Sequence, residues 1–136
     1  MTNQTDIRIL SLMIEKCDRL IEICSNHNNE EISSNYIYSD AIQFEFEKLY
    51  EDSTRLSAEF RLYHQELHID DLRGIRNRVA HDYESVSLKI LLDTVRDDIP
   101  VLRNTLSDFL EKETKNSCQR QLFFYSKKFS ILLQMI

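Results

Sequence analysis

The near absence of glycine and proline constrains the fold of this chain more than any other sequence feature. Its 136 residues include one Gly and one Pro. These two residue types supply most of the tight turns that an all-β domain needs between its short strands. Long helices with short polar connections therefore suit the sequence better than hairpins. The chain has the length of one domain and can enclose a continuous hydrophobic core.

The first predicted helix begins near Thr5 and Asp6, which offer N-cap side chains. It ends in the polar cluster of residues 25–29, whose side chains compete for backbone hydrogen bonds. Between these limits, apolar residues alternate at spacings of three and four, which places them on one helical face. This apolar stripe consists of Ile7, Leu10, Ile14, Cys17, Ile21 and Cys24.

A second helix is predicted to begin near residues 39–40 and to end within residues 57–60. Residues 60–68 show no clear period and receive no assignment. The stripe of this helix is continuous at helical spacing. Its members are Ile42, Phe46, Leu49, Ser53 and Leu56.

Three more helices follow in the prediction. The third opens at Asp70 and Asp71, whose carboxylates complement the helix dipole. The fourth begins at Ser85 or Ser87. The fifth begins within residues 97–100, where a proline is tolerated in the first turn. The fold class that we expect is therefore an all-α bundle.

The predicted bundle domain covers residues 1–112, and residues 113–136 form a polar linker and an apolar tail. Residues 122–136 are too apolar for a free segment, which would aggregate. We expect the tail to pack on its own bundle or on a partner chain. Its sequence favours neither helix nor strand.

Charge and cysteine content restrict the function and the location. The net charge of −6 argues against general binding to phosphate backbones, so any RNA contact must depend on a local positive patch. The three cysteines make no metal-binding pattern and are interpreted as small buried hydrophobes. The sequence contains no predicted signal peptide or membrane span, and we expect a cytoplasmic protein that does not bind membranes.

The residues with the clearest chemical potential lie between positions 72 and 83. On a helix, three apolar side chains there define a buried side, and three polar side chains form a column on roughly the opposite side. The apolar set is Leu72, Ile75 and Val79, and the polar column is Arg73, Asn77 and His81. Arg76 lies between the two sets, and Arg78 is the third arginine within six residues.

This combination suits RNA cleavage without a metal or another cofactor. A neutral imidazole at His81 could take the proton of a ribose 2′-hydroxyl. A guanidinium could hold the phosphate and stabilise its developing charge, and Asn77 could orient either group. Two copies facing each other across a two-fold axis would form a basic cleft. The alternative is a solvated helix face with a histidine that caps carbonyl groups.

The segment RNRVAHDY, residues 76–83, resembles the R-x4-H-x-Y signature of the HepT branch of the HEPN proteins. Residues 49–60 (LYEDSTRLSAEF) resemble the family segment I-G-E-A-x-x-x-L-S-x-E-F, and residues 70–75 resemble the stretch that precedes the signature. Residues 97–102 resemble the D-L-P-x-L segment near the last helix. The similarity runs in order from about residue 5 to residue 112.

The resemblance implies an up-and-down HEPN-type bundle of four to five helices that forms a homodimer. It implies a metal-independent endoribonuclease toxin of a type VII-like toxin–antitoxin system, with Arg76 and His81 as the catalytic pair. Asn77 matches the polar residue that follows the arginine, and Arg73 and Arg78 would support the site. The implied partners are RNA and an MntA-type nucleotidyltransferase antitoxin. That antitoxin would attach AMP to Tyr83 and place phosphate charge beside the catalytic pair.

Other interpretations remain open. The chain could be a non-catalytic HEPN subunit that pairs with a nucleotidyltransferase, or an unrelated helical scaffold. Tyr83 could instead pack on the bundle. On an unbroken helix it would turn toward the side of Leu72, Ile75 and Val79, so its modification requires the helix to end near Asp82. His64 and His68, with Glu66 between them, could bind a metal but have no evident third ligand.

The sequence also departs from the family pattern in three places, one of which is the tail of residues 112–136, for which the family has no recognised counterpart. Tyr50 stands where the family usually has glycine, which would keep its helix farther from a neighbour. Residues 67–69 replace the usual proline and aromatic residue before the third helix. The glutamates of residues 45–59 are interpreted as a solvated face.

Overall fold

The computed structural model describes the backbone of residues 3–81 and 85–134 and the side chains of residues 3–79, 88–116 and 134. Within these residues the chain is all-α, as the sequence predicts. Five longer helices alternate with shorter elements. The longer helices are α1 (Gln4–Asn26), α3 (Tyr36–Thr54), α5 (Ile69–His81), α6 (Ser85–Asp97) and α7 (Ile99–Gln134). The shorter elements are α2 (Asn29–Ser34), α4 (Ala58–Tyr63) and the 3-10 turn η1 (Gln65–Leu67).

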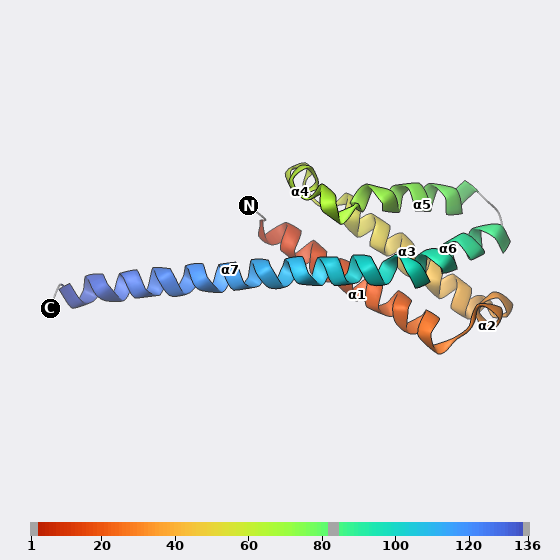
Figure 1. Cartoon of the computed structure of the whole chain (residues 1–136), viewed down its shortest axis with the longest axis horizontal. Helices are drawn as coiled ribbons and strands as arrows, with labels where there is room; N and C mark the ends of the chain where they lie inside the picture. The colour runs from red at the N-terminus through yellow and green to blue at the C-terminus, as the bar shows by residue number, and fades with distance from the viewer. Residues whose placement is uncertain (1–2, 82–84, 135–136) are drawn as a thin grey trace.

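The helices form a bundle around α1, which packs against α3, α6 and α7. The helix α5 packs against α3 on one side and against α6 on the other. Figure 1 shows α7 beginning among the other helices and then extending well beyond them toward the C-terminus. Among the described residues, no helix is long and apolar enough to cross a membrane.

The boundary predicted at residue 112 falls inside α7, because the helix continues without interruption to Gln134. The segment predicted as a polar linker is therefore helical and forms part of α7 as far as the described residues extend. The side chains of residues 117–133 lie outside the described residues. The expectation that the apolar tail packs on the bundle or on a partner remains a prediction.

The helix α1 supplies the central stripe of the core. Asn3 caps it, because its side-chain oxygen accepts a hydrogen bond from the backbone N–H of Asp6 at 2.7 Å. The helix therefore begins slightly before the predicted Thr5 and Asp6. In the fully buried stripe, Leu10 and Cys17 were predicted from the sequence, whereas Met13 and Leu20 were not. The stripe consists of Leu10, Met13, Cys17 and Leu20, with the predicted Ile14 and Ile21 at its edges.

Asparagine caps explain two differences from the predicted helix boundaries. The side chain of Asn28 accepts a hydrogen bond from the N–H of Glu31 at 2.8 Å and begins α2, which the sequence analysis does not anticipate. Asn35 accepts from the N–H of Ile37 at 3.0 Å and begins α3 several residues before the predicted start. An asparagine that ends one helix can also begin the next, because its side chain replaces a missing backbone partner.

A buried carboxylate joins the start of α1 to the start of α4. Asp6 accepts hydrogen bonds from the backbone N–H of Ser57 at 2.9 Å and from its hydroxyl at 2.7 Å. The Ser57 hydroxyl in turn accepts from the N–H of Phe60 at 3.1 Å. Ser57 therefore begins the new helix α4, whereas α3 has already ended at Thr54, before the end predicted within residues 57–60.

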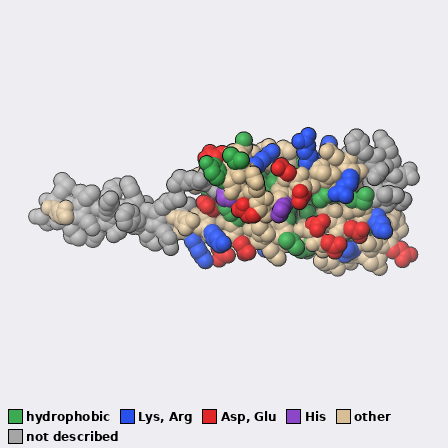
Figure 2. All heavy atoms as spheres, turned by 45° about the horizontal axis from the view of Figure 1, so that its top comes forward, with side chains coloured by type: hydrophobic (Ala, Val, Ile, Leu, Met, Phe, Trp, Pro, Cys, Tyr) green, Lys and Arg blue, Asp and Glu red, His purple; other side chains and the backbone are tan. Residues whose placement is uncertain are grey.

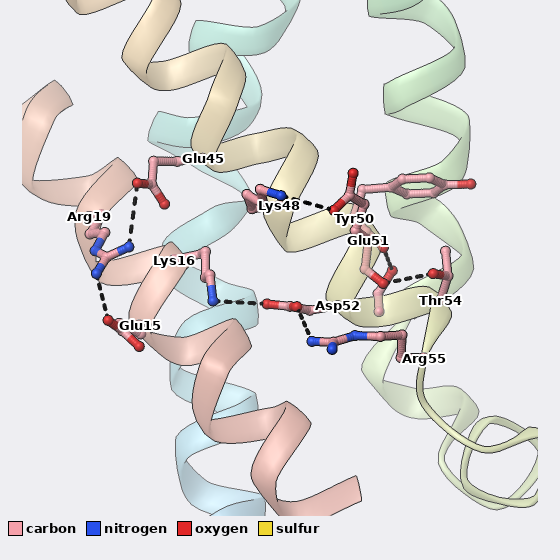
Figure 3. A network of polar contacts seen from close by, with 11 residues as sticks. Glu15, Lys16, Arg19, Glu45, Lys48, Tyr50, Glu51, Asp52, Thr54 and Arg55 are labelled. Atoms are coloured by element: carbon pink, nitrogen blue, oxygen red, sulfur yellow. Dashed lines mark hydrogen bonds and ion pairs between the residues drawn. The ribbon is translucent and has the colours of Figure 1, made fainter. Parts of the chain in front are cut away.

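A second polar contact holds α3 against α1. The ammonium of Lys16 lies 3.1 Å from Asp52, and both side chains are largely buried. Figure 3 shows these two side chains pointing toward each other between the helices, with Arg55 on the other side of Asp52. Breaking a buried pair leaves an uncompensated charge, so this contact strongly favours one register of α3 on α1.

Candidate functional site

The side chains of α5 are distributed as the sequence predicts for its apolar and polar sides. Leu72 is buried, and Ile75 and Val79 pack against the core. Arg73 and Asn77 are exposed. The packing of the apolar side against the bundle therefore places Arg73 and Asn77 on the surface.

Arg76 lies between these two sides and reaches α3. Its side chain is 40% exposed, and its Nε lies 3.5 Å from the carboxylate of Glu47. The guanidinium carbon of Arg76 lies 5.5 Å from the centre of the Tyr50 ring. Contact at this range allows a cation–π attraction. The structure thus gives Arg76 an acidic partner and an aromatic partner, both from α3.

The contact between Arg76 and Glu47 is an ion pair and not a hydrogen bond. The Nε atom of Arg76 is buried and has no hydrogen-bond partner among the described residues. A substrate cannot reach a buried Nε. Any phosphate bound by Arg76 must therefore contact its two Nη nitrogens, which can donate in the fork geometry that suits a phosphate.

Arg78 lies on a different side of α5. It lines a groove of about 770 Å³ between α5, α6, α7 and η1. Six carboxylate side chains also line this groove and make it unfavourable for an RNA backbone. They are Glu66, Asp70, Asp71, Asp93, Asp97 and Asp98. Arg76 and Arg78 therefore do not form one continuous basic patch.

The predicted residues at the end of α5 are only partly described. The backbone of α5 is described through His81, but the His81 side chain lies outside the described residues. Tyr83 lies within residues 82–84, which are also outside them. The proposed roles of His81 and Tyr83 therefore remain predictions from the sequence.

The two histidines that the sequence offers as metal ligands differ in packing and exposure. His64 packs against the rings of Phe60 and Phe109, with ring centres 4.6 and 4.5 Å away. His68 is 75% exposed and has a φ of 52° between η1 and α5. A left-handed backbone at this position lets the chain end η1 and begin α5 in a new direction. Among the described residues, no group of three potential metal ligands occurs.

Sequence reasoning did not identify the partners of Arg76 on α3. Both Glu47 and Glu45, which the sequence predicts on a solvated face, are only partly exposed, and each forms an ion pair with an arginine. The available signal was the three-residue spacing of Glu47 and Tyr50, which puts them on one side of α3. The register of α3 against α5 was still needed to connect that side to Arg76.

Charged residues of both signs are interspersed over the described surface seen in Figure 2. A face of this kind has no broad positive field to attract RNA. On this face, attraction of RNA would therefore depend on small local groups of positive side chains.

Comparisons with known proteins identify a family to which the sequence is similar. The sequence profile of the family described as Ribonuclease HepT-like matches residues 13–109. A curated protein of Caldanaerobacter subterraneus subsp. tengcongensis, named as a putative RNase, is 26% identical over 104 residues. The aligned region covers 76% of this chain and 93% of that protein. No solved structure matches the chain at a significant level.

Proposed function

The chain belongs to the HepT-like ribonuclease family, and we propose that it is a metal-independent endoribonuclease toxin with Arg76 and His81 at its catalytic site. The observation that carries this proposal is the position of Arg76 on α5. Its guanidinium is partly exposed and is held from behind by α3, five residues before His81 on the same helix. The family match includes both residues.

In the proposed reaction, neutral His81 removes the proton of a ribose 2′-hydroxyl, and the resulting oxygen attacks the adjacent phosphorus. The bond from phosphorus to the 5′-oxygen breaks, which leaves a 2′,3′-cyclic phosphate, and the leaving 5′-oxygen takes up a proton from water. Arg76 stabilises the negative charge that develops on the phosphate oxygens. Asn77, which is exposed beside Arg76, orients the phosphate or the imidazole, and Arg73 attracts the backbone of the RNA.

The site is proposed to be completed in a homodimer. One chain contributes a single Arg76 and a single His81, and its neighbouring groove is lined by carboxylates. Two α5 helices facing each other across a two-fold axis would double the positive charge around one RNA strand. The gain in positive charge would be local to the paired helices, because each chain carries a net charge of −6.

The proposal predicts the result of an RNA cleavage assay with purified protein in the presence of a chelator. Wild type should cut RNA, whereas Arg76→Ala and His81→Ala should reduce the rate by at least about 100-fold, because each removes a group that acts in the transition state. His68→Ala is the matched control, since His68 is an exposed histidine at the other end of α5. This control should cut RNA like wild type.

The mass of the wild-type protein must be measured alongside that assay. An unmodified, folded wild type that cuts no RNA would contradict the catalytic proposal and indicate a non-catalytic HEPN subunit. Equal cleavage by wild type and His81→Ala would also overturn the assigned mechanism.

Regulation by an MntA-type nucleotidyltransferase forms the second part of the proposal. Transfer of AMP to Tyr83 would add phosphate charge close to His81 in the sequence and repel the RNA backbone. Co-expression with the enzyme should add mass in AMP units to the peptide that contains Tyr83. Tyr83→Phe should abolish the addition, whereas Tyr63→Phe, which changes an exposed tyrosine on α4, should not. A neutralised complex with unmodified Tyr83 would show inhibition by binding alone.

A further inference from the structure

Tyr50 contacts Arg76 through the face of its ring. The ring projects from α3 toward α5, as Figure 3 shows, and its centre lies 5.5 Å from the guanidinium carbon. The side chain of Tyr50 is half-buried and also packs against the hydrophobic core. Tyr50 therefore combines a packed position with one surface that faces the candidate catalytic arginine.

The backbone that carries Tyr50 is held firmly against α1. Asp52, two residues later, forms its largely buried ion pair with Lys16 at 3.1 Å. Leu49, the residue before Tyr50, is fully buried. The carbonyl oxygen of Tyr50 accepts a hydrogen bond from the Ser53 hydroxyl at 2.6 Å. The backbone of Tyr50 is consequently fixed relative to the bundle, and the side chain that it carries packs against the core.

Arg76, by contrast, has a long side chain with many rotamers. An arginine on a helix surface loses substantial conformational entropy when it is held in one orientation. The carboxylate of Glu47 lies near the Nε atom of Arg76, and the ring of Tyr50 lies against the guanidinium. These two contacts favour an orientation in which the buried Nε faces the protein and the Nη edge remains for a phosphate.

We propose that Tyr50 is a positioning residue that holds the guanidinium of Arg76 in the orientation that binds the scissile phosphate. This inference rests on the proposed ribonuclease function and adds to it a residue from α3. The contribution of Tyr50 comes from the ring and not from the hydroxyl, because the attraction to a cation arises from the aromatic face. Phenylalanine should therefore replace it, and leucine should not.

The first test measures the position of Arg76 without RNA, by NMR of its side chain. The Tyr50 ring current should displace the Arg76 Nε and Cδ proton signals in wild type and in Tyr50→Phe. Tyr50→Leu should shift these signals toward those of an exposed arginine. Tyr38→Leu is the matched control, because Tyr38 is a half-buried tyrosine on the same helix that stacks on His27 and not on Arg76.

The second test measures RNA cleavage by the same proteins. We expect Tyr50→Leu to lower kcat/KM by roughly threefold to tenfold, the range that a cation–π contact supports. Tyr50→Phe should stay within about twofold of wild type for the same reason. Tyr38→Leu should retain wild-type kcat/KM, which separates a specific effect on Arg76 from general loosening of α3.

The two tests distinguish failure of the inference from failure of the proposed function. Unchanged Arg76 signals or unchanged kcat/KM in folded Tyr50→Leu would overturn the positioning role. Equal losses of activity in Tyr50→Leu and Tyr50→Phe would also overturn it, because the ring would not be the active element. A wild type that cuts no RNA would overturn the ribonuclease function itself, while the NMR measurement would still decide whether Tyr50 holds Arg76.

Discussion

Among single residues, Cys17 shows most directly how burial changes chemistry. Burial, together with a smaller contribution from the negative charge of Asp18, raises the pKa of its thiol to about 12. Burial also raises the pKa of Cys24 above its usual value of 9.0. Since the thiolate is the reactive form, both side chains should behave as small hydrophobic groups in the folded protein.

We therefore expect Cys17 to resist alkylation by iodoacetamide at pH 8 and to react after denaturation. Peptide mass spectrometry can follow Cys17 separately from the other cysteines. The raised pKa also predicts that stability is fully present below pH 9.0 and falls as the pH rises toward about 12, because the unfolded thiol ionises first. Cys17→Ala should lose that component. Rapid alkylation of Cys17 in the native protein would contradict this account.

Between elements, Arg96 connects α6 to the end of α1. Its guanidinium donates to the carbonyl oxygens of Cys24 at 2.7 Å and His27 at 2.9 Å. It also donates to the side-chain oxygen of Asn29 at 2.9 Å. The last carbonyl groups of a helix have no partner within the helix, so Arg96 satisfies groups at the end of α1 and at the start of α2.

Arg96→Lys should lower the free energy of unfolding by about 2 kcal/mol, because an ammonium cannot reproduce three donors in a planar array. Chemical denaturation can measure this change. Arg103→Lys is the matched control, since Arg103 forms one ion pair with Asp18 on the surface at 2.8 Å. Arg103→Lys should lower the free energy of unfolding by less than Arg96→Lys does. Equal losses in the two variants would show that the three hydrogen bonds of Arg96 add little.

For the whole molecule, assembly decides whether the proposed site is complete. The groove beside α5 is acidic, and charges of both signs are mixed on the surface in Figure 2. Among the described side chains of α5, Arg73 and Arg76 supply the positive charge that lies outside this groove. Pairing of these arginines from two chains would raise the local positive potential, which controls RNA encounter.

Light scattering of the full chain should therefore give the mass of a dimer, and the cleavage rate per chain should fall on dilution below the dimer's dissociation constant. Mixing Arg76→Ala with His81→Ala would test whether the two chains share a site. Recovery of activity in the mixture would support sites built from both chains. A monomer that cuts RNA at the full rate would remove the argument for a paired cleft.

The sequence by itself determined the helical class and the orientation of α5. Scarce glycine and proline, together with apolar residues at helical spacing, were sufficient to predict five longer helices. The stripe of Leu72, Ile75 and Val79 correctly predicted which side of α5 is buried. These features depend on local periodicity, which a sequence displays directly.

Only the tertiary structure decided what surrounds Arg76 and Arg78. Glu47 and Tyr50 meet Arg76, and carboxylates of η1 and α6 line the groove beside Arg78, through contacts between different segments of the chain. The early start of α3 likewise depends on a single Asn35 cap. Local periodicity cannot specify such contacts, because they depend on the register and angle at which whole helices pack.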